Sequence, residues 1–273
     1  MKKTIVITGA SSGIGKSTAQ YFEQKGWNVA ATMRKPENEK ELKETTSLRL
    51  IALDVENPDS IKRALDESVK AFGKIDVWLN NAGYGAFGPL EAGSREQIQR
   101  QFDVNFFGLI DCIKTIVPHF KQNKAGTIIN VTSIGGLLTV PTFSVYNASK
   151  FALEGLSEGL WYELKPFGIR VKVIEPGGVK TDFSGRSLDQ WDSSNFPEYK
   201  PLTDVMLSRF SNADYTKNFS SPELVSEVVF KAATDDNDTL RYLAGKDAKL
   251  LWGMRRWMGY KFQMKQLQKF FGI

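Results

Sequence analysis

The sequence predicts an α/β protein with a doubly wound parallel sheet, and three observations lead to this expectation. Short apolar runs alternate with longer amphipathic stretches along most of the chain. Each apolar run ends in turn residues, and several amphipathic stretches close on glycine. A glycine-rich turn also joins the first apolar run to the first amphipathic stretch. Repeated strand and helix are typical of a parallel sheet that helices cover on both faces.

The expected strands are, in order, residues 4–9, 28–33, 48–55, 75–83, 127–133, 169–178 and 240–245. The expected helices include 15–26, 57–73, 146–168 and 220–234. Gly26, Gly73 and Gly168 provide the stops, and Ser221 with Pro222 provides a helix start. In such a fold, ligands bind at the carboxyl ends of the strands.

The length and composition narrow the class of protein. A chain of 273 residues suits one domain over 1–273, and its composition is that of an ordinary globular protein. Its single cysteine, Cys112, and single histidine, His119, exclude a disulfide framework and a zinc site built from several Cys or His ligands. We expect no metal, a buried structural Cys112, and a capping or surface role for His119 rather than a catalytic triad.

Charge and hydropathy predict a soluble, cytoplasmic protein. The net charge of +5 is modest and does not indicate nucleic-acid binding. No run reaches the roughly 18 uncharged apolar residues of a spanning helix, and the first apolar run is too short for a signal peptide.

Two segments depart from the strand and helix rhythm. Residues 184–220 carry aromatic side chains among Ser, Asp and Pro without strand periodicity, and this predicts a lid over a ligand pocket. Residues 246–273 predict a helical tail in which basic residues alternate with aromatic residues, and nothing acidic follows Asp247. We expect the tail to pack on the domain, over the pocket or on a partner subunit. Attachment to anionic lipid is the less favoured alternative.

The glycine-rich turn TGASSGIG, residues 8–15, predicts a phosphate site. Gly9 permits a tight turn, while Gly13 and Gly15 let the backbone approach a diphosphate at the positive end of the following helix. The spacing G-x-x-x-G-x-G meets the usual dinucleotide fingerprint only in part. Its place at the first strand-to-helix junction strengthens the prediction.

The end of the second strand indicates which cofactor binds. An acidic residue there holds the ribose hydroxyls of NAD, whereas an arginine suits the 2′-phosphate of NADP. The chain has Arg34 and Lys35 there, and no carboxylate before Glu37. We therefore expect NADP(H) rather than NAD(H), with Ser12 and Arg34 as phosphate contacts. The alternative is that Arg34 and Lys35 are solvated turn residues.

The stretch SVYNASK, residues 144–150, places Tyr146 and Lys150 four positions apart. On a helix these positions share a face, so the lysine charge favours the ionised phenol and lowers the pKa of Tyr146. The alternative is an ordinary helix start with an exposed lysine and a half-buried tyrosine.

Several motifs occur together in a specific order over residues 3–183: TGASSGIG, LDV, NNAG, VNFFG, VTS, YNASK and PGGVKT. In this order the chain resembles the short-chain dehydrogenase/reductase family, and loosely its steroid- and retinol-handling branch. The resemblance implies a Rossmann fold and an oxidoreductase. It also implies that Tyr146 is the proton donor, Lys150 tunes it, Ser133 binds the substrate oxygen and Asn105 holds a relay water.

The family resemblance also implies the cofactor contacts. They are Gly9, Ser11, Ser12, Gly13, Ile14 and Gly15 at the phosphates, Arg34, Asp54 and Val55 at the adenosine, Asn81, Ala82 and Gly83 at its ribose side, Tyr146 and Lys150 at the nicotinamide ribose, and Pro176, Gly177, Val179 and Thr181 at the carboxamide. Alternatively, Asn81 ties loops together and Asp54 caps a turn.

The substrate is less constrained. The pocket residues expected from the family are Ser133, Gly135, Val140, Phe143, Tyr146 and Phe183. An apolar, aromatic wall favours a hydrophobic ketone, aldehyde or secondary alcohol, and thus a carbonyl reductase. The alternatives are a 3-oxoacyl thioester reductase and a non-catalytic NADP(H) sensor. By resemblance we expect a homodimer or homotetramer.

Overall fold

The computed structural model describes residues 2–183, 185–212 and 216–272. In this part of the chain seven parallel strands form one sheet in the order β3-β2-β1-β4-β6-β7-β9. The strands are β1 Thr4–Ile7, β2 Asn28–Met33, β3 Leu48–Ala52, β4 Val77–Asn80, β6 Gly126–Val131, β7 Ile169–Pro176 and β9 Arg241–Ala244. The strand order reverses between β1 and β4, which defines a doubly wound sheet and confirms the predicted fold class.

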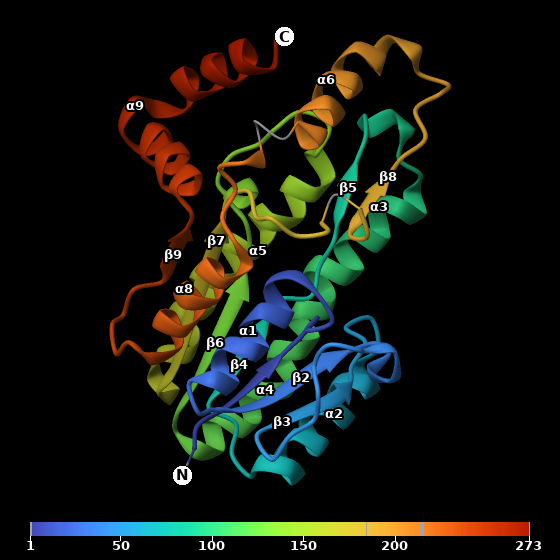
Figure 1. The fold of residues 1–273 in the computed structure, drawn as a ribbon. Coiled ribbons are helices and arrows are strands. Elements are labelled where there is room, and N and C mark those ends of the chain that lie inside the picture. The colour runs from blue at the N-terminus through green and yellow to red at the C-terminus, as the bar shows by residue number, and fades with distance from the viewer. Residues whose placement is uncertain (1, 184, 213–215, 273) are drawn as a thin grey trace.

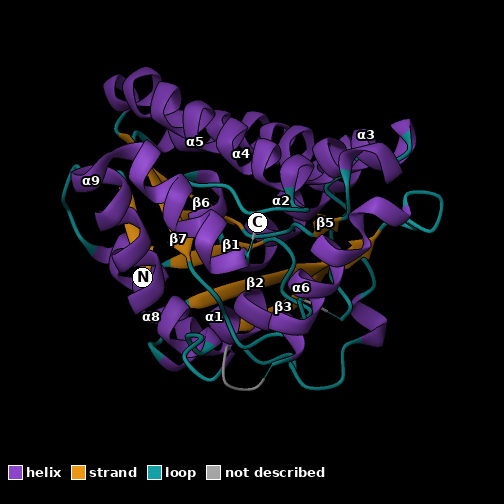
Figure 2. Ribbon diagram, turned by 90° about the horizontal axis from the view of Figure 1, so that it is seen from above, coloured by secondary structure: helices purple, strands orange, loops and turns teal. Residues whose placement is uncertain are grey.

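Helices cover both faces of the sheet (Figures 1 and 2). They are α1 Gly13–Gln24, α2 Pro58–Phe72, α4 Gly108–Asn123, α5 Ser144–Leu164 and α8 Pro222–Thr234, while α3 Arg95–Phe102 packs against α5. One core cluster joins α1 and α8 to the sheet through Phe22, Val225 and Val229. The other joins α2 and α4 to the opposite face through residues such as Ile61 and Ile113.

The sequence signals act as expected at the helix ends. The Ser221 hydroxyl accepts a hydrogen bond from Leu224 N at 3.3 Å, which satisfies a free N–H of the first turn of α8. Gly26, Gly73 and Gly168 have φ of 83°, 81° and 71°, a region that side chains with a Cβ rarely adopt. Helix α5 begins two residues before the predicted start, at Ser144.

The surroundings of Cys112 and His119 indicate structural rather than catalytic roles for both residues. Cys112 lies on the buried side of α4 and is fully buried in the core, and burial raises the pKa of its thiol. His119 Nε2 accepts a hydrogen bond from Ile75 N at 3.1 Å, at the entry to β4. His119 therefore ties α4 to the segment before β4 and does not cap a helix end, in contrast to the capping role expected from the sequence.

The segment at 184–220 is more ordered in its fold than its sequence indicates, although residues 184 and 213–215 lie outside the described part. Strand β8, Leu188–Gln190, pairs with β5, Gly85–Phe87, in a small parallel sheet beside the main one. Helix α6, Lys200–Ser211, follows. Three residues are too few to show an alternating pattern, so β8 was not predicted.

The tail is helical, as predicted. Helix α9, Lys246–Phe271, is interrupted at Gly259, where φ is 77°, and so consists of two shorter helices. In Figure 1 it bends away from the sheet and returns towards α6. Among the described residues, no helix has both the length and the apolar character that crossing a bilayer requires.

Candidate active site

Ser133 and Tyr146 meet just beyond the carboxyl end of β6. Ser133 begins a 3-10 turn, Ile134–Gly136, and its Oγ accepts a hydrogen bond from Gly135 N at 3.0 Å. The Tyr146 side chain, in the first turn of α5, hydrogen-bonds the Ser133 side chain. A Cβ on Gly135 would lie 3.3 Å from Ser133 Oγ and 3.4 Å from Tyr146 Cε1. Gly135 thus leaves room beside the two hydroxyls, which is what a substrate oxygen needs.

Aromatic rings surround Tyr146. The ring centroids of Phe143 and Phe183 lie 6.0 Å and 5.9 Å from that of Tyr146. Burial therefore raises the pKa of Tyr146 above 10, and the hydrogen bond with Ser133 opposes this only in part. The sequence-based expectation of a lowered tyrosine pKa is wrong, because loss of hydration on burial outweighs the hydrogen bond with Ser133.

Lys150 is buried, with 6% of its surface exposed, so the alternative of a solvated lysine is excluded. Its Nζ donates to Val131 O at 3.1 Å and lies 5.8 Å from the Tyr146 ring centroid. Burial lowers the pKa of Lys150 from 10.5 to about 8, although the nearby Glu154 carboxylate acts in the opposite direction. Lys150 is therefore poised to exchange a proton near neutral pH.

Asn105 lies in a π-helical turn, Asp103–Phe107, between α3 and α4. Its Oδ1 accepts from Tyr84 N at 3.0 Å, and its Nδ2 donates to Tyr84 O at 2.9 Å and to Ser149 Oγ at 3.2 Å. The side chain is thus occupied by protein partners. The relay water expected at Asn105 therefore stays a prediction.

The glycine-rich loop is folded against the end of β4. Gly9 has φ of 69°, and a Cβ there would lie 2.9 Å from Ala82 Cα. Asn81 Nδ2 donates to Thr8 O at 2.9 Å and to Gly9 O at 3.2 Å. Asn81 therefore ties loops together, which was the structural alternative for this residue, and Gly15 packs under the same amide group.

The start of α1 fits a diphosphate. Ser12 is the N-cap residue, its hydroxyl caps no backbone N–H, and the first turn contains no acidic residue. The N–H groups of Gly13, Ile14 and Gly15 are thus available to an anion, which the helix dipole also attracts. Ser11 Oγ accepts a hydrogen bond from Arg186 Nη2 at 3.4 Å. The positively charged Arg186, from the segment after β7, therefore also reaches this loop.

The adenosine end of the site contains cations without carboxylate partners. Arg34 and Lys35 follow β2 directly and are exposed, and neither side chain pairs with another described residue. The nearby carboxylates of Glu39 and Glu41 instead bind Lys16, at 3.2 Å and 3.0 Å. The carboxylates of Glu39 and Glu41 are thus occupied, and Glu37 is the exposed acid that remains in this loop.

Two further predicted contacts lie at the end of β3. Asp54 Oδ1 accepts from Glu56 N at 3.1 Å, so Asp54 does cap a turn, the alternative that the sequence left open. Val55 beside it is buried.

The loop after β7 is fixed to β9 and to the start of α9. Gly177 N donates to Ala244 O at 3.0 Å, and Gly178 N donates to an Asp247 carboxylate oxygen at 2.6 Å. Further on, Val179 pairs with Ser220 as an isolated bridge. The loop after Pro176 then reaches Thr181. The Cγ2 atom of Thr181 would lie 3.2 Å from a Cβ placed on Gly13. The predicted carboxamide and phosphate contacts are thus adjacent.

The predicted pocket residues Val140, Phe143 and Tyr146 belong to one apolar cluster, whose other members lie far away in sequence: Phe87, Leu188, Met206, Leu207, Leu267 and Phe271. Sequence reasoning did not find Phe87, whose ring centroid lies 5.2 Å from that of Phe143. The tail's contribution, Leu267 and Phe271, agrees with the expectation that the tail packs over the pocket.

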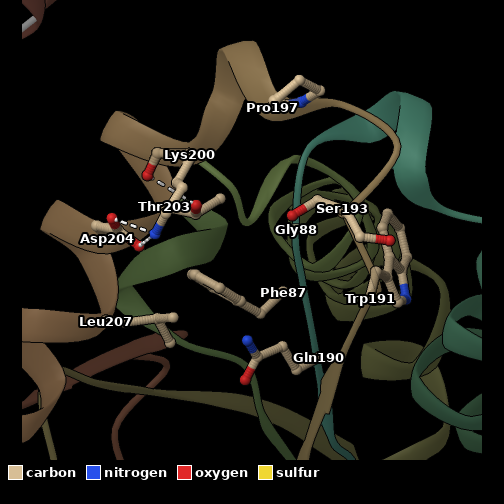
Figure 3. Close-up of a pocket in the computed structure, with 11 residues that line it drawn as sticks. Phe87, Gly88, Gln190, Trp191, Ser193, Pro197, Lys200, Thr203, Asp204 and Leu207 are labelled. Atoms are coloured by element: carbon tan, nitrogen blue, oxygen red, sulfur yellow. Dashed lines mark hydrogen bonds and ion pairs between the residues drawn. The ribbon is translucent and has the colours of Figure 1, made fainter.

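A cavity of about 260 Å³ lies beyond Phe87, between β8 and α6 (Figure 3). Its lining combines the Phe87 and Trp191 rings with the ion pair of Lys200 and Asp204, in which Nζ and Oδ2 are 2.7 Å apart. The cavity therefore extends the aromatic wall of the candidate site towards polar groups of the 184–220 segment.

A charged cluster behind Lys150 also escaped the sequence analysis. Glu154, one turn further along α5, accepts from Thr132 Oγ1 at 2.5 Å and pairs with Arg241. Arg241 also binds Glu175, with an N–O separation of 3.1 Å. The available signal was the spacing of four residues between Lys150 and Glu154, while Arg241 reaches the cluster only through the β7 and β9 pairing.

Comparison with known proteins identifies the family. The short chain dehydrogenase family model matches residues 3–191, and the chain therefore belongs to this oxidoreductase family. A 3-ketodihydrosphingosine reductase of Bacteroides thetaiotaomicron is 32% identical over 272 residues, covering 98% of both chains.

Solved structures show the same architecture. A short-chain dehydrogenase from Streptomyces avermitilis aligns with a TM-score of 0.81 and 27% identity over 94% of this chain and 96% of its own. ElxO with NADP bound aligns with a TM-score of 0.71 and 25% identity over 89% of this chain and 98% of its own. Another short-chain dehydrogenase/reductase with this fold, from Burkholderia phymatum, was solved with NAD, so fold alone does not choose the cofactor.

Proposed function

We propose that this protein catalyses reversible hydride transfer between NADP(H) and a hydrophobic ketone, aldehyde or secondary alcohol, and that it acts as a carbonyl reductase. The observation that carries this proposal is the hydrogen-bonded Ser133 and Tyr146 pair, with buried Lys150 behind it and aromatic rings around it. A catalytic site needs such a tuned phenol, whereas a non-catalytic sensor has no use for one.

The residues divide the chemistry in a simple way. A bound NADPH supplies the hydride that reduces the carbonyl carbon. Ser133 and Tyr146 donate hydrogen bonds to the carbonyl oxygen, and Tyr146 transfers its phenolic proton as negative charge develops there. The raised pKa of Tyr146 keeps this proton in place before reaction. Lys150 stabilises the phenolate that remains and can return a proton to it.

The choice of NADP(H) rests on the adenosine end of the site. Arg34 is exposed directly after β2 and has no carboxylate partner among the described residues, while Glu39 and Glu41 bind Lys16. A guanidinium can grip a 2′-phosphate through two parallel hydrogen bonds. The Ser12 hydroxyl, which caps no backbone N–H, is the second expected phosphate contact.

A hydrophobic substrate is supported by the wall of the pocket. The rings of Phe143 and Phe183 contact the ring of Tyr146, and the ring of Phe87 contacts that of Phe143. The buried Phe271 of the tail belongs to the same cluster as Phe87, Phe143 and Tyr146. The relative from Bacteroides is, by its name, a reductase of 3-ketodihydrosphingosine. We therefore place long-chain carbonyl compounds first among the candidates.

The test is a panel of carbonyl compounds assayed through NADPH absorbance. The panel includes long-chain ketones, small water-soluble ketones and acetoacetyl thioesters, which represent the alternative thioester reductase. We expect turnover with hydrophobic ketones, loss of turnover with retained NADPH binding for Tyr146→Phe, and normal turnover for the control Tyr162→Phe on the exposed side of α5. Normal turnover by Tyr146→Phe would remove this residue from its role.

A further inference from the structure

The bend of α9 exposes large apolar side chains. Every residue from 256 to 261 is exposed, and this stretch has the sequence RWMGYK. Trp257 is 81% exposed, Tyr260 is 61% exposed and Met258 is 53% exposed. Figure 1 shows this bend at the outer edge of the molecule, away from the sheet. Three large apolar side chains at one projecting point form a candidate interaction surface.

The opposite side of the helix is already used. Gln263 and Phe271 are buried, and Leu267 packs between them against the cluster that contains Phe143 and Tyr146. Arg209 of α6 donates to Phe270 O and its guanidinium lies 4.0 Å from the Phe270 ring centroid. The packed residues Gln263, Leu267 and Phe271 therefore fix the helix after the bend against the domain. The exposed side chains of the bend lie outside this packed side.

The net positive charge of the chain lies in this tail. Of the 36 Lys and Arg residues six follow Asp247, which leaves 30 in the rest of the chain against all 31 Asp and Glu residues. These six are Lys249, Arg255, Arg256, Lys261, Lys265 and Lys269, and within the described residues none of them pairs with a carboxylate. The partner of this surface must therefore supply negative charge.

We propose that the bend of α9, residues 256–261, docks on an anionic lipid bilayer. Trp257, Met258 and Tyr260 would enter the boundary between headgroups and acyl chains, while Arg256, Lys261 and Lys265 bind anionic headgroups. A second copy of the chain fits less well, since a two-fold interface at this surface would bring two sets of cations together.

The position of the bend gives docking a consequence for the active site. The helix after the bend continues through Leu267 to Phe271, which belongs to the aromatic cluster around Tyr146. A bilayer that holds the bend would thus bind one end of a helix whose other end forms part of the pocket wall.

The test measures binding of the full-length protein to vesicles by flotation, with phosphatidylcholine alone and with a quarter of phosphatidylglycerol. We expect binding only with the anionic lipid. Each cation near such a surface contributes about fivefold to partitioning, so Lys261→Gln with Lys265→Gln lowers it about 30-fold. The matched control is Lys62→Gln with Lys70→Gln, two exposed lysines of α2, which should keep wild-type binding.

A second pair of variants tests insertion of the aromatic side chains. Trp257→Ser with Tyr260→Ser should weaken binding tenfold or more, whereas Tyr162→Ser, which removes an equally exposed ring from α5, should not. Turnover, in buffer without vesicles, of a ketone that the panel identifies as a substrate reports on folding and on the proposed reaction, and it should be unchanged in all these variants. Docking and catalysis can therefore fail separately.

Three results would overturn the proposal. The first is equal flotation of the wild type with and without anionic lipid. The second is wild-type binding by the Trp257→Ser, Tyr260→Ser protein, which indicates attraction to any polyanion. The third is a concentration-dependent dimer that these two substitutions dissociate while vesicles bind nothing, because a second copy then covers the bend.

Discussion

Replacing Lys150 by methionine should make the cofactor-free protein more stable while abolishing turnover. Lys150 is 6% exposed, and burial lowers its pKa from 10.5 to about 8. At pH 6.5 the lysine is charged in both the folded and the unfolded chain. Each pKa unit corresponds to 1.36 kcal/mol, so burying the charged form costs about 3 kcal/mol of folding free energy. Methionine has a similar length and carries no charge.

The hydrogen bond from Lys150 Nζ to Val131 O offsets part of this gain. Its loss costs about 1 kcal/mol, which leaves a net stabilisation of about 2 kcal/mol. For a chain of this size we expect the melting temperature to rise by about 5 °C. The lysine's folded pKa is lowered, so the wild type regains stability as pH rises from 8 to 10.5, and the difference between the proteins fades across that window.

The measurement is thermal unfolding of both proteins without cofactor at pH 6.5 and near pH 10. Lys62→Met on the exposed side of α2 is the control and should change stability by less than about 0.5 kcal/mol. A Lys150→Met protein that melts below the wild type at pH 6.5 would contradict this reasoning. An increase of equal size at both pH values would also contradict it, since it would show better packing rather than removal of a buried charge.

Three further substitutions test other parts of the site. Arg34→Glu should shift kcat/KM from NADPH towards NADH by tenfold or more, because a carboxylate repels the 2′-phosphate and binds ribose hydroxyls, and an unchanged ratio would refute the role of Arg34. Gly9→Ala should weaken NADPH binding or folding, since its Cβ would lie 2.9 Å from Ala82 Cα at a φ of 69°, and a normal affinity and melting temperature would show that the loop adapts. Glu154→Gln should lower the pKa of Lys150 further and move the alkaline limb of the kcat profile to lower pH, because it removes a carboxylate that favours the charged lysine.

The location of the candidate site could be predicted from sequence because the order of strands and helices along the chain determines where the turns between them lie. In a parallel sheet all strands end at the same edge, so turns after β1, β4, β6 and β7 must gather there. Gly9, Asn81 and Ser133 therefore lie at the same edge of the sheet although they are far apart in the chain. This required only the sequence of strands and their turn residues, which are the strongest signals that a single chain contains.

The electrostatics of the site could not be predicted in this way. The spacing of Tyr146 and Lys150 shows that they share a face of α5, but it does not show what covers that face. Burial depends on Phe143, Phe183 and the end of β6, and it moves the two pKa values in directions opposite to their mutual attraction.

The tail resisted prediction for a different reason. Gly259 interrupts α9 with a non-helical conformation, so residues on its two sides do not continue one helical phase. Apolar and basic residues then look evenly mixed along 246–271, although each half has its own inner and outer side. The packing of Phe271 and the exposure of Trp257 became distinguishable only in the structure.

The two perturbed pKa values together predict a direction for the reaction. When Tyr146 has given its proton to the product, the phenolate has a pKa above 10, and Lys150 has a pKa of about 8. Return of a proton from the charged lysine to the phenolate is therefore favourable, because burial raises the pKa of Tyr146 and lowers that of Lys150. Oxidation must drive this proton in the reverse sense, so we expect it to require pH above 8, where Lys150 is neutral and bulk water accepts the proton. Initial rates in both directions between pH 6 and 10 measure this, and an oxidation rate that is already maximal at pH 6.5 would show that the buried pair does not set the direction.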